Sequence, residues 1–377
     1  MFTAALKFRN QKRIPMYDAF ASSTALLVHG HGINNSTAFI DSTLINSLLN
    51  VGAPIINTAV SKFGKGSIYL NGSSYVSIPY TTALTPSDGF TLEFWVYALP
   101  QVNGNPRIIS NMEWNSTQGW DLSCEGGQII FFCAGGNGIG VPYSLDANWH
   151  HFAFTRSGTT FRSFKDGVLS STTSITAQLI PQRATFIGAK GINPTGTQFK
   201  GYIEDMRITK ACRYVSNFAV PTAPFSLYDT SNISARYWRV LQIADSYQVG
   251  QLKEMSSFSI GMFSSKDCTG IDLCLGKTAI ASSQYSTSYQ ANYALDGNTI
   301  SRWGAAQGQP TYAWWRVDMG SPVSVNSFNW QAFDAFIGKA LAIQYSFDDI
   351  VWNTYSIVYP PVTVNNQVLS FTNLGTI

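Results

Sequence analysis

The stretch Gly201-Tyr-Ile-Glu-Asp-Met-Arg-Ile-Thr-Lys210 says most about the fold of this 377-residue chain. Met206 and Ile208 share one face of a predicted strand, which leads into a basic turn. An aromatic segment, Arg213-Tyr-Val-Ser-Asn-Phe218, and a proline-rich exit, Pro221-Thr-Ala-Pro-Phe225, come next. The stretch therefore predicts a short strand, a basic turn and an aromatic exit.

Two earlier segments also show strand patterns. Thr91-Leu-Glu-Phe-Trp-Val-Tyr97 carries bulky side chains on both faces, so we expect a central strand with one face in the core and one in a curved groove. Trp149-His-His-Phe-Ala-Phe-Thr-Arg-Ser-Gly158 precedes a turn at Lys165-Asp-Gly167. In this order the three segments resemble laminin-G-like, concanavalin A-type jelly-roll modules, most closely those of tailed-phage virion proteins. The resemblance implies a recognition surface rather than a reaction centre.

Composition favours an all-β fold of two tandem β-sandwiches. Aromatic residues make up 14% of the chain and charged residues only 12%, while long helical periodicities are absent. A net charge of +3 is too small to imply nucleic acid as the main partner. No apolar run approaches the roughly 20 residues that span a bilayer, and the N-terminal residues lack a signal-peptide pattern. We therefore expect neither membrane insertion nor secretion by that route.

The predicted organisation is an N-terminal arm at 1–23, a laminin-G-like sandwich at 24–225, a linker at 226–234 and a second sandwich at 235–377. The arm carries four basic residues before its first acid, Asp18, with apolar residues among them. It is interpreted either as a solvated tail or as an arm that docks on an acidic face of a neighbouring subunit.

The second sandwich begins with the predicted strand Ala235-Arg-Tyr-Trp-Arg-Val-Leu-Gln-Ile243. The segments that follow it are Gly276-Lys-Thr-Ala-Ile-Ala-Ser-Ser283, Ala294-Leu-Asp-Gly-Asn298, Ser301-Arg-Trp-Gly304, Trp315-Arg-Val-Asp-Met-Gly320 and Gln344-Tyr-Ser-Phe-Asp-Asp-Ile-Val-Trp352. Together they resemble the discoidin, or coagulation-factor type C, module, in which a strand of the 235–243 type closes the domain. The resemblance implies a circularly permuted module, in which this strand pairs with strands beyond Gly276; a truncated, unpermuted domain is the alternative.

No catalytic constellation is predicted. Glu204 and Asp205 are neighbours in a strand, so we expect them to point to opposite faces. His29 and His31 are two residues apart and suit a shared metal, but no acid lies near them in sequence, and the resembling family has Asp-Gly where His31-Gly32 stands.

The five cysteines are expected to be free thiols, because an odd number without a dense framework is typical of a reducing compartment. Pairing of Cys124 with Cys133 across a hairpin, or of Cys268 with Cys274 in a short loop, is the alternative.

Calcium is the cofactor that the resemblance implies, held by Asp296 and Ser301 in the loop Asp296-Gly-Asn-Thr-Ile-Ser301. The alternative is an Asx-turn in which Asp296 accepts hydrogen bonds from its own backbone. Aromatic and basic residues near loop ends form the predicted glycan-binding set, which comprises Arg302, Trp303, Tyr312, Trp314, Phe333 and Phe336.

These features predict a non-enzymatic virion protein of a phage, assembled in the bacterial cytoplasm and located in the virion. A tail fibre, baseplate or receptor-binding component that contacts host surface glycan is the first hypothesis. Its expected partners are other virion proteins, through the arm, and further copies of itself. An outer capsid decoration protein and a polysaccharide-degrading enzyme are the alternatives.

Overall fold

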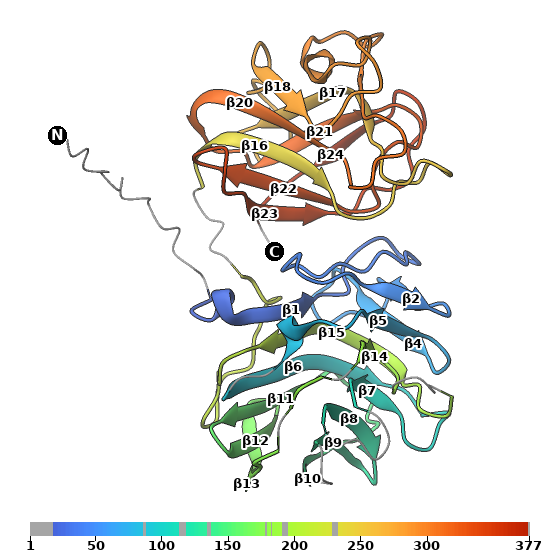
Figure 1. The fold of residues 1–377 in the computed structure, drawn as a ribbon, viewed down its shortest axis with the longest axis vertical. Coiled ribbons are helices and arrows are strands. Elements are labelled where there is room, and N and C mark those ends of the chain that lie inside the picture. The colour runs from blue at the N-terminus through green and yellow to red at the C-terminus, as the bar shows by residue number, and fades with distance from the viewer. Residues whose placement is uncertain are drawn as a thin grey trace, which may run out of the picture.

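A computed structural model describes residues 18–85, 88–112, 118–133, 137–177, 179–181, 183–190, 195–227 and 233–375. Two β-sandwiches follow one another along the chain, which confirms the predicted fold class (Figure 1). Within the described ranges the helices are three short 3-10 turns: η1 (Ala21–Ser23), η2 (Thr82–Leu84) and η4 (Ala291–Leu295). Among these residues, no helix has the length and apolar character needed to cross a membrane.

The first sandwich packs an eight-stranded antiparallel sheet against a seven-stranded antiparallel sheet. The larger sheet runs β13 (Val168–Ser174), β12 (Thr160–Lys165), β11 (His150–Ser157), β6 (Gly89–Ala98), β15 (Lys200–Thr209), β4 (Ser67–Asn71) and β3 (Ile55–Asn57), and β1 (Thr24–Val28) also pairs with β15. The smaller sheet runs β10 (Asn137–Pro142), β9 (Gln128–Cys133), β8 (Trp120–Glu125), β7 (Arg107–Ser110), β14 (Thr185–Ile187), β5 (Tyr75–Ile78) and β2 (Leu49–Val51). The strand expected to be central, β6, lies between β11 and β15.

Apolar side chains that alternate along the strands fill the space between the two sheets. Leu92, Phe94 and Val96 point inward from β6 and are buried. They share this core with Trp120 and Phe131, whose rings stack with centroids 5.7 Å apart. Burial of each such side chain contributes about 1.5–3 kcal/mol, so this interlayer core is the main source of stability in the first sandwich.

The other face of β6, which carries Glu93 and Trp95, is covered by protein. Glu93 is 0% exposed and Trp95 is 3% exposed, because residues 211–227 run back across the sheet. The Tyr214 hydroxyl donates to the Glu93 carboxylate over 2.9 Å, and the ring of Phe218 contacts His151 of β11. The prediction of a curved groove on this face is therefore wrong.

Residues 18–23, the end of the predicted arm, also pack on this sheet. The Asp18 carboxylate accepts hydrogen bonds from both terminal nitrogens of Arg213, over 2.8 and 2.6 Å, and from Arg207 over 3.1 Å. Residues 1–17, which hold the four basic residues of the arm hypothesis, lie outside the described residues, and docking by the arm stays a prediction.

The second sandwich packs a five-stranded sheet on a four-stranded sheet, both antiparallel. The first runs β18 (Thr278–Ala281), β20 (Trp314–Val323), β16 (Ala235–Gln242), β22 (Leu341–Ser346) and β23 (Asn353–Val358). The second runs β19 (Trp303–Gly304), β17 (Ser256–Phe263), β21 (Ser327–Ala332) and β24 (Val368–Phe371).

Strand β16 occupies the centre of the five-stranded sheet. Val240 lies opposite Trp315 of β20 on one side and opposite Ile343 of β22 on the other. Its pairing with strands beyond Gly276, predicted from the sequence, is confirmed. Trp238 on the same strand is fully buried, so β16 supplies part of the core. The permuted chain order itself stays a prediction.

All five cysteines are free, as expected. Cys124 lies opposite Ile129 and Cys133 lies opposite Trp120 in the β8–β9 hairpin, so the two thiols do not face each other. Burial raises the pKa of Cys133 to about 11, which disfavours the reactive thiolate.

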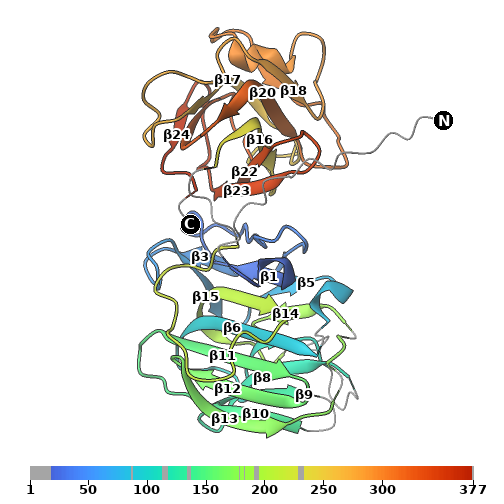
Figure 2. The same cartoon turned by 90° about the vertical axis from the view of Figure 1, so that its left-hand side faces the viewer.

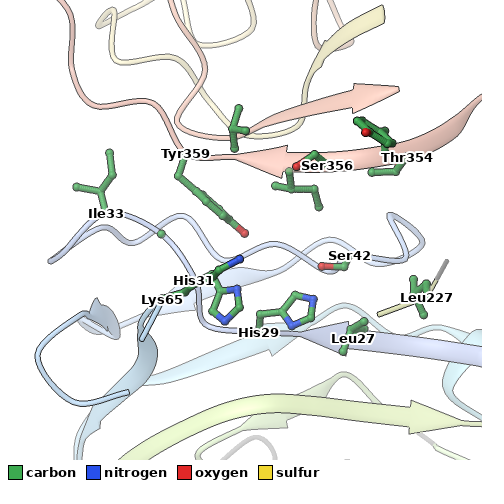
Figure 3. A pocket seen from close by; sticks show the side chains of 14 residues that line it. Leu27, His29, His31, Ile33, Ser42, Lys65, Leu227, Thr354, Ser356 and Tyr359 are labelled. Atoms are coloured by element: carbon green, nitrogen blue, oxygen red, sulfur yellow. The ribbon is translucent and has the colours of Figure 1, made fainter. Parts of the chain in front are cut away.

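The two sandwiches meet between the loop after β1 and the end of β23, and the turned view in Figure 2 also places β23 next to the first sandwich. The ring of Tyr359, just beyond β23, lies against Gly32 of the first sandwich. A cavity of about 390 Å³ lies at this junction, with His29, His31 and Lys65 on one side and Thr354 to Tyr359 on the other (Figure 3).

Candidate ligand-binding site

One aromatic cavity brings together half of the residues that the sequence predicts for ligand binding. Arg302, Phe333 and Phe336 line a cavity of about 280 Å³ in the second sandwich. Arg302 directly precedes β19, and the two phenylalanines follow β21, so loops at one end of the sandwich form the cavity. This Arg302 pocket also contains Tyr285 and Tyr289, from the loop after β18.

The guanidinium group of Arg302 is held by aromatic rings rather than by acids. Its central carbon lies 3.5 Å from the ring centroid of Phe333 and 4.6 Å from that of Tyr289. Such cation–π contacts contribute about 0.5–2 kcal/mol and fix the plane of the guanidinium group. Phe333 stacks in turn on Phe336, with centroids 5.5 Å apart.

Arg302 also has a buried hydrogen-bond donor without an acceptor. Among the described residues Arg302 forms no ion pair, and its Nε–H is buried without a hydrogen-bond partner. A buried donor that lacks an acceptor costs about 1–3 kcal/mol, and more for a charged group. The site is therefore poised to gain from a ligand that brings an acceptor oxygen.

Tyr285 and Tyr289 were not predicted from the sequence. Their rings meet edge to face with centroids 5.5 Å apart, and Tyr285 is 55% exposed. Both stand in Gln284-Tyr-Ser-Thr-Ser-Tyr-Gln290, an otherwise polar loop. Two aromatic residues in such a loop are the signal that would have identified them, since neither serves a strand face.

Trp303 is not a ligand-binding residue, and that prediction is wrong. Its side chain is fully buried in the core of the second sandwich, and its indole N–H donates to the carbonyl of Ser283 over 3.2 Å. Because consecutive side chains along a strand point to opposite sides, Arg302 faces the cavity while Trp303 faces the core.

Tyr312 and Trp314 lie apart from the Arg302 pocket. They line a larger groove of about 800 Å³ between the sandwiches, opposite residues 37–50 of the first. The Tyr312 hydroxyl donates to the Asp245 carboxylate over 3.0 Å. Trp314 faces outward while its neighbour Trp315 is fully buried, as the alternation predicts. The predicted set is thus divided among three places: the Arg302 pocket, the core and this groove.

The carboxylate of Asp296 accepts hydrogen bonds from within its own loop, residues 296–301. The Asn298 N–H donates to one oxygen of Asp296 over 2.8 Å, and the Ser301 hydroxyl donates to the other over 2.5 Å. This is the geometry of an Asx-turn. Calcium binding here stays a prediction.

The carboxylates of the first sandwich are buried and paired. Burial by itself raises the pKa of Glu93, but Arg207, His151 and Arg213 together outweigh this effect and lower it to about 2. Arg207 donates to Glu93 from Nε and Nη2 over 2.9 and 2.7 Å. Glu93 is therefore held as a structural anion.

Glu204 and Asp205 do not point to opposite faces, and that prediction is wrong. A bulge in β15 between Glu204 and Arg207 places Asp205 at a φ of +52°, which turns both carboxylates to the same side. Burial raises the pKa of Glu204 to about 7, against hydrogen bonds from the backbone N–H groups of Lys62 and Phe63. Both carboxylates are 0% exposed, so neither faces solvent.

Comparison with known families agrees with the two folds. Residues 70–216 match the concanavalin A-like lectin/glucanases superfamily. Residues 278–372 match the F5/8 type C domain. The chain therefore contains a laminin-G-like module of the concanavalin A type followed by a discoidin-type module, in the predicted order. No curated protein matches the chain.

Solved structures with related folds share little sequence with the chain. Domain 4 of AbnA, an extracellular GH43 arabinanase from Geobacillus stearothermophilus, is 14% identical with a TM-score of 0.39; the match covers 50% of this chain and 93% of that one. The binding domain of botulinum neurotoxin serotype D/C is 11% identical with a TM-score of 0.43, covering 94% and 100%. The serotype G binding domain is 15% identical with a TM-score of 0.41, covering 93% and 92%. Sequence identities and TM-scores this low give no basis for assigning a function to this chain.

Proposed function

We propose that this chain is a non-enzymatic adhesion protein that binds an acidic surface glycan in the Arg302 pocket. One observation carries the proposal: the Arg302 guanidinium is stacked on aromatic rings beside an open cavity, with a buried N–H that has no acceptor. A sugar carboxylate or phosphate supplies both the missing acceptor and the missing counter-charge.

The remaining walls of the pocket suit the apolar side of a sugar. The rings of Tyr285, Tyr289 and Phe336 offer faces and edges on which sugar C–H groups pack. A cavity of about 280 Å³ lies at the small end of ligand sites, which favours the end of a glycan over a long stretch of chain. The match of the first sandwich to a superfamily of lectins and glucanases supports a glycan as the ligand class.

A polysaccharide-degrading enzyme is the less favoured function. Glycoside hydrolysis needs two carboxyl groups that flank a bound sugar. In the first sandwich Glu93, Glu204 and Asp205 are each 0% exposed and engaged with protein partners. Glu93 and Asp205 bond to the covering segment at 211–227 and Glu204 bonds to the turn at 61–63, so none of them faces an open sugar site.

The location we propose is the virion of a phage, on a tail fibre, baseplate or receptor-binding component. Its support is the resemblance of the first module to those of tailed-phage virion proteins, together with the geometry of the Arg302 pocket. The alternative is an outer capsid decoration protein, which would bind glycan through the same modules. Imaging of particles that carry a labelled chain distinguishes the two locations.

The test is binding of the full chain to an array of acidic and neutral bacterial capsular polysaccharides. We expect acidic polysaccharides to bind, and Arg302→Met to weaken that binding at least about tenfold, the effect of one lost charge-assisted contact. Arg236→Met is the matched control, because Arg236 is exposed and paired with Asp318 on a different face. Equal binding of neutral glycans, or an unaffected Arg302→Met variant, refutes the proposal.

A further inference from the structure

A second group of polar side chains lies at the junction of the two sandwiches, far in sequence from the Arg302 pocket. His29 and His31 follow strand β1, and Asp205 lies on the neighbouring strand β15. One ligand atom of each residue lies within 4.8 Å of the others, and all three residues are buried. Figure 3 shows the two imidazole rings side by side on the floor of the junction cavity.

The contacts within this group are short. Nδ1 of His29 lies 2.5 Å from Oδ1 of Asp205, and the two imidazole rings stack with centroids 4.9 Å apart. Glu204 approaches from the same bulge, with Oε1 3.6 Å from Nε2 of His31. Two imidazoles and the Asp205 carboxylate thus converge, and Glu204, whose oxygens also accept hydrogen bonds from Ser61, Lys62 and Phe63, borders the group. These residues lie far apart in the sequence.

One nitrogen in this group has no partner. Nε2 of His31 is buried and accepts or donates no hydrogen bond, although the residue is only 8% exposed. A neutral imidazole has one nitrogen that carries a hydrogen and one that carries a lone pair, and the second can bind a metal ion. A buried polar atom without a hydrogen-bond partner costs free energy, and an ion that binds it removes this cost.

We propose that His29, His31, Asp205 and Glu204 bind a divalent transition-metal ion such as Zn²⁺. Neutral imidazole and carboxylate are ligands that zinc prefers, at about 2.0–2.2 Å. Ligands at those distances on a tetrahedron lie about 3.4 Å apart. The 3.6 Å between His31 and Glu204 already approaches this spacing, and small side-chain rotations bring the other atoms in.

The ion takes the place of the hydrogen bond between His29 and Asp205. Lys65 lines the same cavity and its positive charge opposes a cation, while the Asp205 carboxylate attracts both. The junction cavity of about 390 Å³ gives the ion a path to the site. Tyr359 reaches over the imidazoles from the second sandwich, so a bound ion lies directly beneath the contact between the two modules (Figure 3).

The test measures Zn²⁺ binding by the full chain after treatment with a chelator. We expect one zinc per chain after gel filtration, and visible absorption bands of a four-coordinate site when Co²⁺ is used instead. His31→Leu removes the unpartnered nitrogen and is expected to weaken zinc binding at least about tenfold. Glu204→Gln keeps the size and one acceptor oxygen of the side chain, so it serves as the second variant if His31→Leu fails to fold.

His150→Leu is the matched control. His150 lies between Asp146 and Asp166 at 2.8 and 2.6 Å, on an exposed part of the first sandwich, and could hold a surface ion. Binding that survives His150→Leu and is lost in His31→Leu supports the buried site. Absence of zinc from the wild-type chain overturns the proposal. So does binding that only His150→Leu removes, which means an adventitious ion only.

Discussion

Two arginines, one in each sandwich, stack on a phenylalanine ring at nearly the same distance. Arg207 lies 3.7 Å from the ring centroid of Phe225, and Arg302 lies 3.5 Å from that of Phe333. Their polar surroundings differ. Arg207 also donates to Glu93 and Asp18, whereas Arg302 has no carboxylate partner among the described residues and keeps a buried N–H without an acceptor.

The difference separates an arginine that stabilises the fold from one that is available to a ligand. A buried charge with a paired acid and filled hydrogen bonds gains nothing more from a partner. A stacked, unpaired guanidinium beside a cavity gains strongly from an anion, because the aromatic rings have already fixed its position. The comparison predicts opposite responses of the two sites to mutation, to acid and to ligand.

The largest expected effect is on stability. Arg207→Met leaves Glu93 buried without its partner and is expected to reduce the free energy of unfolding by about 3–5 kcal/mol. The matched change Arg302→Met is expected to alter it by less than about 1 kcal/mol, since no acid loses its partner. Urea denaturation of both variants measures the contrast, and equal losses would remove the distinction between the two arginines.

The next effect is on the response to acid. Against the effect of burial, Arg207, His151 and Arg213 lower the pKa of Glu93 from an ordinary value of 4.5 to about 2, so its ionised form stabilises the folded state. That stabilisation is present above pH 4.5 and is lost as the pH falls toward 2, and the difference corresponds to about 3 kcal/mol. Unfolding measured from pH 6 to pH 2 should therefore show a smaller loss in Arg207→Met than in wild type and Arg302→Met. If the free energy of unfolding falls equally with pH in all three proteins, the stabilising role of the Glu93–Arg207 ion pair is contradicted.

Much of the fold could be predicted from the sequence because strand alternation and turn residues are local signals. The central strand at 91–97 follows from such patterns, whereas the pairing of 235–243 and the order of the two modules follow from the family resemblance. The bulge at Asp205 could not be predicted, because it depends on how β15 pairs with β6 and not on its own residues. The cover over Glu93 was missed for a similar reason: it is made by residues about 120 positions further along the chain.

The candidate site was predicted in part. Arg302, Phe333 and Phe336 were predicted because basic and aromatic residues cluster near loop ends. Trp303 was included in error: side chains alternate along a strand, so when Arg302 faces the cavity Trp303 must face the core. The histidine pair was noticed, but its acids lie more than 170 residues away in sequence. Only the antiparallel pairing of β1 with β15 brings them together.

The most direct test of the glycan proposal is to follow the Nε–H resonance of Arg302 by nuclear magnetic resonance while an acidic polysaccharide from the array is added. Arg302→Met identifies this resonance by its absence, and the Arg207 resonance serves as an internal reference. We predict that the Arg302 signal shifts and becomes protected from exchange as its missing acceptor arrives, while the Arg207 signal stays in place. A bound glycan that leaves the Arg302 signal unchanged would contradict the assignment of the ligand site.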